Sequence, residues 1–323
     1  MFSDPGPAQS AGVQRSAPRP AATAPGILVI VLCYNGIADT LACLESLQRV
    51  EYPSFDVLVL DNASSDGTPE AVRERFPQVT VIENGANLGF AAGNNVGLRY
   101  ALRHGYDYAL LLNNDTEVAP DFLTRLIDVA ASDPTIGVVG PTITYYERPD
   151  LIWSAGGMID WRHGIARMRT NEVDSGQYRE PADVDFVTGC ALLVKRAALE
   201  RAGLLDERFF MYFEETEWCV RIGRAGFRML HVPQSQVLHK IPLNARFDKE
   251  YLAYYMTRNR LLFLRATHAP LSAWLHALIL QDLRTYISLV LRPKWRTRAG
   301  RQGMRQGWID FWCGRFGPLA RTW

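Results

Sequence analysis

Polar side chains that suit metal chemistry follow an apolar run at residues 110–112, which leads directly into Asn113, Asn114 and Asp115. Carboxylate and amide oxygens are hard ligands for Mg²⁺ or Mn²⁺. A cation that bridges to a diphosphate needs just one or two protein carboxylates, because phosphate oxygens and water fill its other positions. The same residues also fit a strand-to-helix turn in which Asn and Asp satisfy backbone groups. The motif by itself leaves both interpretations open.

A second apolar run, at residues 57–60, ends in Asp61 and continues through small residues to Gly67. A carboxylate at the end of a strand can accept the N3–H of a pyrimidine base. Small side chains after it let a nucleotide pass close to the backbone. The alternative interpretation is a tight, well-capped turn.

A third segment, at residues 87–95, places Asn87, Gly89 and Asn94 around the start of a predicted helix. Its glycines allow a close approach of a ligand to the backbone. The segment is not a GxGxxG motif that follows a strand, so the pattern disfavours a dinucleotide cofactor.

Three acids, Glu214, Glu215 and Glu217, follow an aromatic run at residues 209–213 and open a predicted helix. Acids in a first helical turn are favourable simply because they face the positive end of the helix dipole. The functional alternative is a general base beside an apolar wall, which accepts a proton from an attacking hydroxyl. His239 lies further along the chain and could reach a metal or a diphosphate from the opposite side, although a lone histidine is more often structural.

The elements around these motifs alternate between strand and helix. Apolar runs at residues 27–32, 56–60 and 108–112 predict buried strands, each followed by a helical pattern. This alternation predicts an α/β fold with a mostly parallel sheet, in which ligands bind at the carboxyl ends of the strands. We therefore expect the loops at residues 33–36, 61–67 and 113–117 to line one site.

The rest of the chain carries weaker signals. Short strands are expected at residues 80–83 and 136–139. Residues 141–185 look irregular, with short strand-like pieces around residues 151–153 and 184–186, and residues 251–323 look helical. Residues 1–25 are rich in Pro, Ala, Ser and Gly, which predicts a disordered tail. The start of the chain lacks the pattern of a signal peptide, and the five cysteines have no paired CxxC spacing, which favours a reducing cytosol over a disulfide scaffold.

Charge is distributed unevenly, although the net charge of the whole chain is +1. Residues 271–323 hold nine Arg or Lys against two Asp, together with five of the eight tryptophans. Apolar residues recur at helical spacing through residues 271–291, but His276, Gln281, Asp282 and Arg284 interrupt them, which argues against a spanning helix. The pattern favours a helical, basic and aromatic extension at a membrane surface; the alternative is an ordinary helical cap.

The order and spacing of these motifs resemble the family-2 glycosyltransferases of the GT-A fold, in particular the rhamnosyltransferase-like enzymes of bacterial surface polysaccharide synthesis. The resemblance covers roughly residues 26–265 and is densest over residues 188–226. It implies a Rossmann-like α/β catalytic domain, a nucleotide-diphosphate-sugar donor, a divalent metal (Mg²⁺ or Mn²⁺) and inversion at the anomeric carbon. Residues 266–323 are then a membrane-associating extension.

Carried over by position, the resemblance implies that Glu215 is the catalytic base and that Asp115 and His239 hold the metal. Asn114 stands where the family often has a second Asp, and Glu215 stands where it usually has Asp. Two further groups are expected at the site: donor-contacting residues Asn35, Asp61, Asp66, Asn87, Gly89, Asn94, Asn113 and Asn114, and acceptor-side or supporting residues Thr188, Gly189, Cys190, Glu214 and Glu217.

The resemblance implies transfer of L-rhamnose from dTDP-rhamnose to a glycan or lipid-linked acceptor, at the inner face of the cell membrane and without nucleic acid. A UDP-sugar transferase of the same family is the nearest alternative. A nucleotidyltransferase or a non-catalytic nucleotide-sugar-binding module is disfavoured, because Asp61, Asp115 and Glu215 are all present.

Overall fold

The computed structural model describes residues 24–242, 249–291 and 298–319. The predicted disordered tail at residues 1–25 therefore lies, up to residue 23, outside the described residues. Of its last two residues, Pro25 accepts a hydrogen bond from the Tyr52 hydroxyl at 2.8 Å. Residues 292–297 and 320–323 of the basic extension also lie outside the described part.

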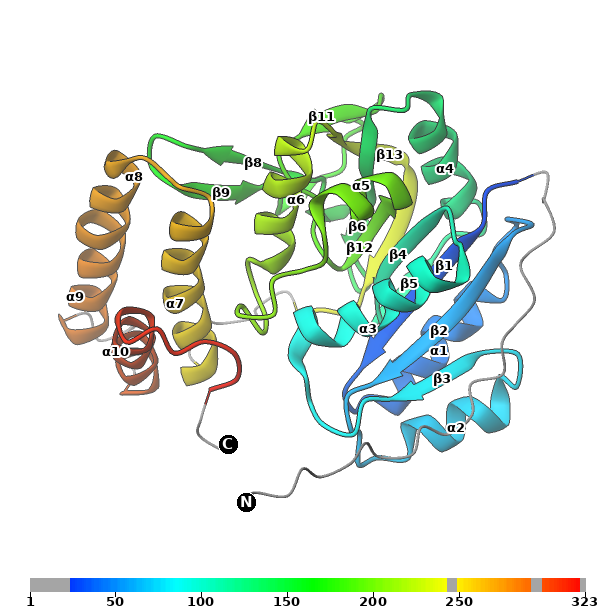
Figure 1. Cartoon of the computed structure of the whole chain (residues 1–323), viewed down its shortest axis with the longest axis horizontal. Coiled ribbons are helices and arrows are strands. Elements are labelled where there is room, and N and C mark those ends of the chain that lie inside the picture. The colour runs from blue at the N-terminus through cyan, green and yellow to red at the C-terminus, as the bar shows by residue number, and fades with distance from the viewer. Residues whose placement is uncertain (1–23, 243–248, 292–297, 320–323) are drawn as a thin grey trace, which may run out of the picture.

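The first half of the chain forms the predicted parallel part of a large sheet (Figure 1). Strand β1 pairs in parallel with β2 on one side and with β4 on the other, and β2 pairs in parallel with β3. The crossovers between these strands are helical, as the sequence predicts. The elements are β1 (Ile27–Cys33), α1 (Ile37–Leu47), β2 (Phe55–Asp61), α2 (Thr68–Arg75), β3 (Thr80–Glu83), α3 (Gly89–His104) and β4 (Tyr108–Asn113).

The sheet continues with strands that run in both directions, and the sequence pattern does not reveal these directions. Strand β12 runs antiparallel between β4 and β6, and the long strand β13 pairs in parallel with β6 and antiparallel with β5. The elements are β5 (Thr116–Val118), α4 (Phe122–Ser132), β6 (Ile136–Tyr145), β7 (Leu151–Ser154), β8 (Gly157–Asp160), β9 (Ile165–Met168), β10 (Glu172–Val173), β11 (Ala182–Val184), β12 (Ala191–Lys195) and β13 (Arg228–His239).

Residues 141–185 contain the end of β6 and five short strands, more than the two expected. The strand-like piece at residues 151–153 is confirmed as β7, and the piece at 184–186 overlaps only the last residue of β11. Each of these strands is four residues or shorter, which is too short to show a hydrophobic period. The α/β architecture is as predicted, but the strands beyond β4 are largely antiparallel.

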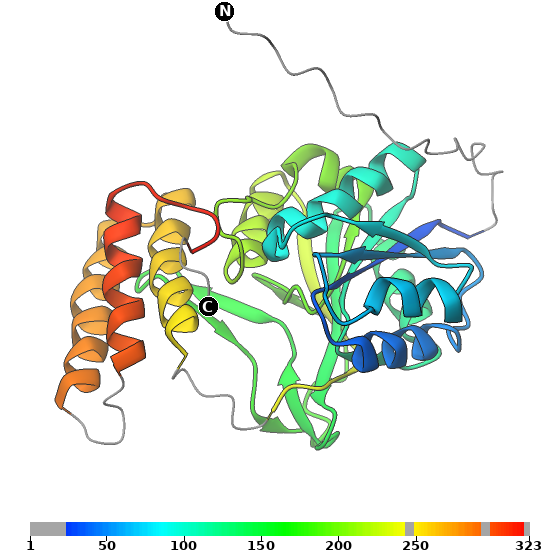
Figure 2. The same cartoon turned by 90° about the horizontal axis from the view of Figure 1, so that it is seen from below.

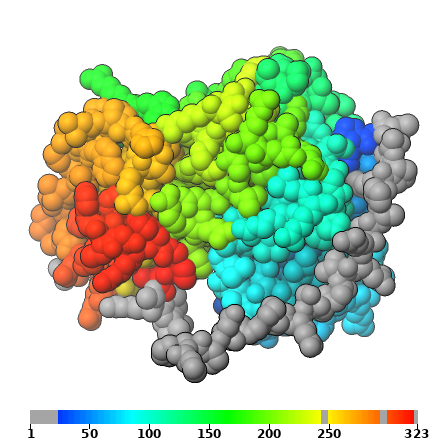
Figure 3. Space-filling view, in the orientation of Figure 1, coloured from blue at the N-terminus to red at the C-terminus, as the bar shows by residue number. Residues whose placement is uncertain are grey.

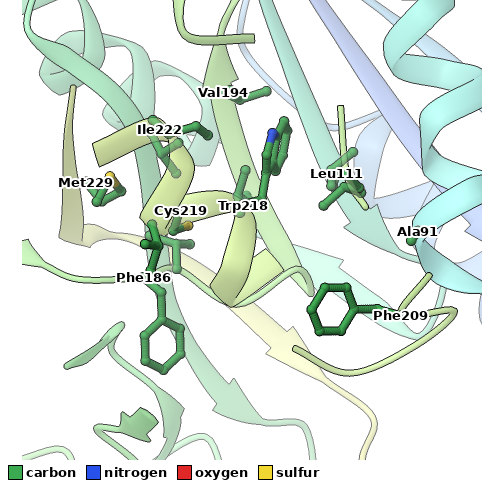
Figure 4. Close-up of a cluster of buried hydrophobic side chains, with 14 of the residues drawn as sticks. Ala91, Leu111, Phe186, Val194, Phe209, Trp218, Cys219, Ile222 and Met229 are labelled. Carbon is green, nitrogen blue, oxygen red and sulfur yellow. The ribbon is translucent and has the colours of Figure 1, made fainter. Parts of the chain in front are cut away.

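Two apolar layers cover the two faces of the sheet. Alternate residues of β1 enter opposite layers: Leu28 and Ile30 on one side, and Val29 and Val31 on the other. The first layer includes the fully buried Trp218 of α6, which packs among the side chains in Figure 4 and donates its indole N–H to the Gly203 carbonyl at 2.7 Å. Replacing Trp218 with Ala would cost about 3–5 kcal/mol of stability, as is typical of a buried aromatic side chain.

The remaining helices are α5 (Arg196–Ala202), α6 (Glu214–Arg224), α7 (Glu250–Ala266), α8 (Leu271–Leu275), the π-helix η1 (His276–Leu283), α9 (Arg284–Leu291) and α10 (Arg298–Trp312). Helices α7 to α10 pack together at one end of the molecule (Figures 1 and 2), and in the space-filling view they form one lobe that contacts the sheet domain (Figure 3).

Helix α10 approaches α7 closely through glycines. A Cβ atom on Gly307 would lie 2.8 Å from the Tyr254 carbonyl oxygen, so a larger residue there would push the two helices apart. Asp282, which looks in the sequence like a break in an apolar run, is buried between helices, where it pairs with Arg260 of α7 and accepts the Trp308 indole N–H of α10 at 2.7 Å. No helix in the described part of the chain has the length and apolar character needed to cross a membrane.

Candidate active site

The three loops that the sequence places at one edge of the sheet do meet there. Strand pairing brings Cys33 beside Asp61 and Leu32 beside Asn113. The Asn35 N–H donates to the Ser64 hydroxyl at 2.7 Å, and the Asn35 side chain accepts the Ser65 N–H at 2.9 Å. Asn35 has a φ of 60°, a conformation that Asn tolerates better than most residues.

Asp61 is almost fully buried and holds its own loop together. Its carboxylate accepts the Ser64 N–H at 2.9 Å and the Cys33 thiol at 3.4 Å. Asp66 is likewise engaged, because it accepts the Ile37 N–H at 3.0 Å and the Thr68 hydroxyl. The Thr68 hydroxyl is the main cause of the lowered pKa of Asp66. These bonds correspond to the well-capped turn that the sequence left open as an alternative.

Asn87 and Gly89 form a hydrogen-bonded cluster with Asn62, a residue that the sequence analysis did not single out. Asn62 is buried, and its amide donates to the Gly89 carbonyl at 3.1 Å. Asn87 accepts the Gly89 N–H at 3.0 Å. Gly89 has a φ of 75°, and a Cβ atom there would lie 2.5 Å from the Phe210 ring, so only glycine fits. Asn94 is buried and donates to the Phe90 carbonyl of its own helix at 3.0 Å.

The amides after β4 tie that strand to its neighbours. The Asn113 N–H donates to the Cys190 carbonyl at 2.9 Å, and the Asn114 amide donates to the Thr40 hydroxyl of α1 at 2.9 Å. Asp115 follows them at the start of the short strand β5. Because β13 pairs with β5 so that His239 lies opposite Thr116, the histidine reaches the aspartate.

Asp115 and His239 form a close pair. The Nε2 atom of His239 lies 3.2 Å from Oδ1 of Asp115, and the imidazole is almost entirely buried against the edge of Trp153. Burial opposes charge on both groups. The neighbouring Cys190 and Asp115 outweigh it and raise the pKa of His239 to about 10. His239 and Lys240 likewise outweigh burial and keep the pKa of Asp115 below its usual value. Both side chains are therefore charged at neutral pH.

The donor set of this pair fits a divalent cation. Oδ1 of Asp115 is buried and contacts Nε2 of His239 at 3.2 Å, and Nδ1 of the same imidazole is buried without a hydrogen-bond partner. No group of three or more His, Cys, Asp or Glu side chains in the described ranges is arranged to hold a metal. Asp115 and His239 would then be two ligands of a cation whose other ligands include diphosphate oxygens and water, and binding of the cation would displace the proton of His239.

Glu214 and Glu215 lie in a contrasting environment, at the start of α6. Glu214 is buried with Oε2 unpartnered, and Glu215 is half-buried. Burial, followed for Glu214 by the charge of Glu215, raises the pKa of both carboxyls. Gly189 lies against this turn, since a Cβ atom there would be 3.7 Å from the Glu215 Cβ and 2.7 Å from the Phe90 ring.

Glu217 is the third acid and has a structural partner. Its carboxylate accepts two contacts from Nε of Arg221, at 2.7 and 2.9 Å, and Arg221 continues to the carbonyls of Ala202 and Leu204. Glu217 lines an open pocket of about 590 Å³ with Arg221, Arg208 and Arg265, and none of the proposed donor-contacting side chains lines that pocket. The structure therefore separates Glu217 from Glu215.

The segment of Thr188, Gly189 and Cys190 connects the two carboxylate sites. Gly189 lies beside Glu215, while the Cys190 carbonyl bonds to Asn113 and the Cys190 thiol lies beside His239. Thr188 and Cys190 are buried, and the Thr188 hydroxyl accepts the Cys190 N–H at 3.5 Å. All five cysteines are unpaired, as their spacing predicts.

Two polar residues near the site escaped the sequence analysis. Lys240 lies directly after His239, donates its N–H to the Asp115 carbonyl at 2.9 Å, and pairs with Asp39 and Glu117 at 3.4 and 3.0 Å. Asn62, directly after Asp61, was the other. The sequence offered one signal for both residues: each directly follows a predicted site residue, His239 or Asp61.

Comparison with known proteins assigns the class. Residues 28–203 match the family model described as glycosyl transferase family 2, and the chain belongs to this family. It is therefore a glycosyltransferase, and its large central sheet flanked by helices is the GT-A fold.

Among curated relatives, the chain is 30% identical over 306 residues to an N-acetylglucosaminyl-diphospho-decaprenol L-rhamnosyltransferase of Mycobacterium tuberculosis. That match covers 86% of this chain and 95% of the relative. The chain is also 24% identical over 259 residues to the dTDP-rhamnosyl transferase RfbF of Shigella flexneri, covering 76% of this chain and 82% of the relative. The resemblance to rhamnosyltransferases is thereby confirmed at the level of homology.

Solved structures share the fold at low sequence identity. The mannosyltransferase PcManGT from Pyrobaculum calidifontis, in complex with GDP-Man and Mn²⁺, superposes with a TM-score of 0.58 at 18% identity, over 91% of this chain and 90% of its own. GalNAc-T7 with UDP, GalNAc and Mn²⁺ gives a TM-score of 0.60 at 16% identity, over 89% of this chain and 57% of its own.

Proposed function

We propose that this glycosyltransferase transfers a sugar, with inversion, from a nucleotide-diphosphate donor to a hydroxyl group of a glycan or lipid-linked acceptor. One observation supports the proposal most strongly. A charged Asp115–His239 pair and a carboxyl of raised pKa at Glu215 flank the same short segment at Gly189 and Cys190. A site for a diphosphate-bound cation therefore lies near a group suited to accept a proton.

The chemistry follows from these positions. Glu215 accepts the proton of the acceptor hydroxyl as the oxygen attacks the anomeric carbon, and its raised pKa makes it a better base than an exposed carboxylate. The bond from that carbon to the diphosphate breaks on the opposite face. Asp115 and His239 would hold a divalent cation, which would stabilise the charge on the departing nucleoside diphosphate. Asp61 and the hydrogen-bonded cluster of Asn62 and Gly89 would form the part of the sheet edge that contacts the nucleotide.

Of the three acids after the aromatic run, Glu215 fits the base best. Glu217 is already neutralised by Arg221, and Glu214 is buried, whereas Glu215 is half-exposed beside Gly189. A base must reach the proton that it takes, so accessibility decides between neighbouring carboxylates.

For the donor, we propose dTDP-L-rhamnose, supported by the names of the two relatives with high coverage. The test is a panel of nucleotide sugars, including dTDP-rhamnose, UDP-GlcNAc and GDP-mannose, incubated with the purified chain and a glycan or polyprenyl-diphosphate-sugar acceptor. The expected result is metal-dependent release of nucleoside diphosphate, fastest with dTDP-rhamnose. Fastest release from a UDP-sugar would make the chain a family-2 transferase of another specificity. Release of pyrophosphate instead would indicate a nucleotidyltransferase, and binding without release would indicate a binding module.

We also propose that the extension rests on an anionic lipid surface. One face of the helical stretch at residues 271–291 is apolar and 45–73% exposed; we call it the outer face. Its members recur every four residues: Leu271, Leu275, Ile279, Leu283, Ile287 and Leu291.

The π-helix explains how this spacing stays on one face. In an α-helix a step of four residues overshoots a full turn by about 40°, so a long stripe at this spacing would wind around the helix. A π-helix has more residues per turn, and η1 offsets that drift in the middle of the stretch.

The charge around the outer face selects the partner. Arg284 is exposed on α9, Arg298 and Arg305 are exposed on the neighbouring helix α10, and residues 271–323 carry a net charge of +7 by sequence. Basic side chains near an anionic bilayer contribute about 1 kcal/mol each, and apolar side chains enter the headgroup boundary. We infer a peripheral position at the inner face of the cell membrane, where a lipid-linked acceptor would be within reach.

The membrane proposal is tested by flotation with anionic and neutral liposomes. Ile279→Ser should weaken binding about fivefold, because about 1 kcal/mol of apolar burial is lost, whereas Val173→Ser, at a similarly exposed apolar site on β10, should leave binding unchanged. Equal binding by both variants would overturn the proposal. Concentration-dependent self-association abolished by Ile279→Ser would assign the outer face to a second copy of the chain instead.

A further inference from the structure

The turn that delivers Glu215 has an unusual backbone. Phe210, Tyr212 and Phe213 have φ angles of 67°, 69° and 72°, in the left-handed region that bulky residues avoid. Phe213 is the residue immediately before α6, so its conformation directs the first turn that carries Glu214 and Glu215. Strain of this kind persists only where the surroundings hold it in place.

A single side chain of α7 holds most of this turn. The Asn259 amide lies within hydrogen-bonding distance of three of its carbonyls: those of Phe209 at 2.8 Å, Met211 at 2.7 Å and Tyr212 at 3.0 Å. Asn259 is fully buried, so water does not compete for these bonds.

Its neighbour Arg258 also donates hydrogen bonds to this segment of main chain. Nη2 of Arg258 donates to the Phe209 carbonyl at 2.9 Å and to the Arg208 carbonyl at 3.2 Å, and Nε donates to Oδ1 of Asn259 at 2.9 Å. Nη1 reaches the Gly317 carbonyl at 2.7 Å and the Tyr254 hydroxyl at 3.0 Å.

Arg258 is a fully buried cation whose hydrogen bonds go to carbonyls and a hydroxyl rather than to a carboxylate of the described chain. The rings of Tyr254 and Tyr255 lie 5.0 Å from its guanidinium carbon. The Tyr254 hydroxyl donates in turn to Asp310 at 2.8 Å, so this carboxylate is linked to Arg258 through the hydroxyl and not by direct contact. Burying a charge without a direct counter-ion is costly, and an apolar residue of similar size would usually serve stability at least as well. The arrangement is better explained by the five donors in a fixed plane that a guanidinium offers to a folded main chain.

The held turn also touches the donor side of the site. The Phe210 carbonyl accepts the Phe90 N–H at 2.6 Å and the Ala91 N–H at 3.2 Å, at the start of α3. The Phe90 ring in turn lies against Gly189, beside Glu215. The main chain at residues 208–212 is therefore fixed between α7 and α3.

We propose that Arg258 and Asn259 are positioning residues of the transfer reaction, which hold the main chain at residues 208–212 so that Glu215 faces the acceptor beside Gly189. The inference rests on the proposed function in one respect, the role of Glu215 as the base. It assigns the C-terminal helices a part in catalysis, in addition to their proposed contact with lipid.

The test compares Asn259→Leu with Asn95→Leu in the full chain. Asn95 is a matched control: it is also a buried helical asparagine, and it bonds to the Leu205 carbonyl at 2.9 Å, the Leu205 N–H at 3.0 Å and the Glu207 carboxylate at 2.9 Å, all upstream of residues 208–212. Both variants should lose similar thermal stability. We expect Asn259→Leu alone to lower kcat roughly 10-fold to 100-fold, because a displacement of about 1 Å at a reacting group costs this much, with the donor KM changed less than twofold.

If Asn259→Leu does not fold, Arg258→Lys replaces it in the test. Arg258→Lys keeps the buried charge and removes the planar donors, and it should lower kcat by a similar factor. Equal kcat in the Asn259 and Asn95 variants, whether both are unchanged or both reduced, would overturn the inference, because ordinary loosening of this region would then explain the result.

Hydrogen–deuterium exchange of residues 209–215 separates this inference from the proposed function. Exchange should accelerate in Asn259→Leu and not in Asn95→Leu. Failure of the unsubstituted chain to release nucleoside diphosphate from any donor would overturn the proposed function, while faster exchange in Asn259→Leu would still establish that Asn259 holds the turn. Unchanged exchange would overturn the positioning role whatever the donor result.

Discussion

The two carboxylate sites of this glycosyltransferase lie in opposite electrostatic environments. Asp115 has a histidine 3.2 Å away and Lys240 nearby, which together keep its pKa below the usual value although the group is largely buried. Glu214 and Glu215 have no basic side chain among the causes of their pKa shifts, and burial raises the pKa of both. One site thus keeps a carboxylate charged, and the other makes a carboxylate ready to take a proton.

The difference lies in how each site is built. Asp115 directly precedes β5 and His239 ends β13, and the pairing of these two strands sets the separation of the two side chains. Glu215 follows a strained turn that depends on side chains of α7. Environments that push the pKa values of neighbouring acids apart commonly separate the roles of those acids in a reaction. Here the two environments are consistent with the two roles that we propose, metal binding for Asp115 and proton acceptance for Glu215.

The largest effect is expected for Asp115→Ala. Loss of this carboxylate removes one of the two protein ligands proposed for the cation, and transfer should fall by roughly 10³-fold or more, since charge on the leaving group is no longer stabilised. The measurement is nucleoside-diphosphate release with and without added Mn²⁺. Asp183→Ala, which breaks a surface pair with Arg228 at 2.8 Å, is the control and should retain full activity. Near-normal rates for Asp115→Ala, or full activity in excess chelator, would remove the metal from this site.

Glu215→Gln should come next, with kcat lowered roughly 10²-fold to 10⁴-fold because the side chain keeps its shape and loses the proton acceptor. The same substitution at Glu214 and Glu217 sharpens the comparison, since the three carboxylates lie within one turn of α6. Kinetics of the three variants decide the assignment. If Glu214→Gln or Glu217→Gln is the inactive variant, then accessibility and pairing have identified the wrong acid.

A smaller and different effect is expected at Asp61. A carboxylate that binds the nucleotide base should matter for donor affinity, so Asp61→Ala should raise the donor KM about tenfold and lower kcat less. The measurement is a full donor titration at saturating acceptor. Ser64→Ala removes a loop hydroxyl that accepts the Asn35 N–H and leaves the Asp61 carboxylate, so it controls for disturbance of the loop alone. A defect confined to kcat would take Asp61 out of base recognition.

The sheet-edge site could be predicted from the sequence because its signal is local. An apolar run that stops at Asn113, Asn114 and Asp115 marks the end of a strand, and a second parallel strand, on the other side of β1, ends the same way at Asp61. The partner of Asp115 was less evident. Strand β13 pairs with β5 from more than one hundred residues away, and local periodicity carries no information about such pairing.

The helical side of the molecule was harder to predict. The sequence analysis predicted a helix here and did not single out Arg258 or Asn259, yet both are fully buried, because a turn fifty residues upstream lies against them. Asp282 looked like an interruption of an apolar run and is instead a buried partner of Arg260 and Trp308. In each case the polar side chain faces inward, toward a partner that only the folded chain provides.

The smallest predicted effect concerns stability and follows from the unpartnered carboxyl of Glu214. Burial, and then the Glu215 charge, raise its pKa well above the usual value, so the folded chain retains a proton that the unfolded chain has already released. Folding stability is then greatest at low pH and falls as the pH rises through the raised pKa. Glu214→Gln removes this loss and should raise the melting temperature at about pH 8 by roughly 2–4 °C, as expected for about 1 kcal/mol in a domain of this size, with little change at about pH 5.

Glu217→Gln is the internal control for that measurement and should change stability in the opposite direction. The substitution is the same and lies three residues along the same helix, but it removes the carboxylate that pairs with Arg221 at 2.7 Å, so the melting temperature should fall at about pH 8. Thermal melts of both variants from about pH 5 to about pH 9 provide the test. Destabilisation by Glu214→Gln at high pH would mean that Glu214 has a stabilising partner in solution. The contrast between a paired and an unpaired carboxylate would then not extend to the first turn of α6.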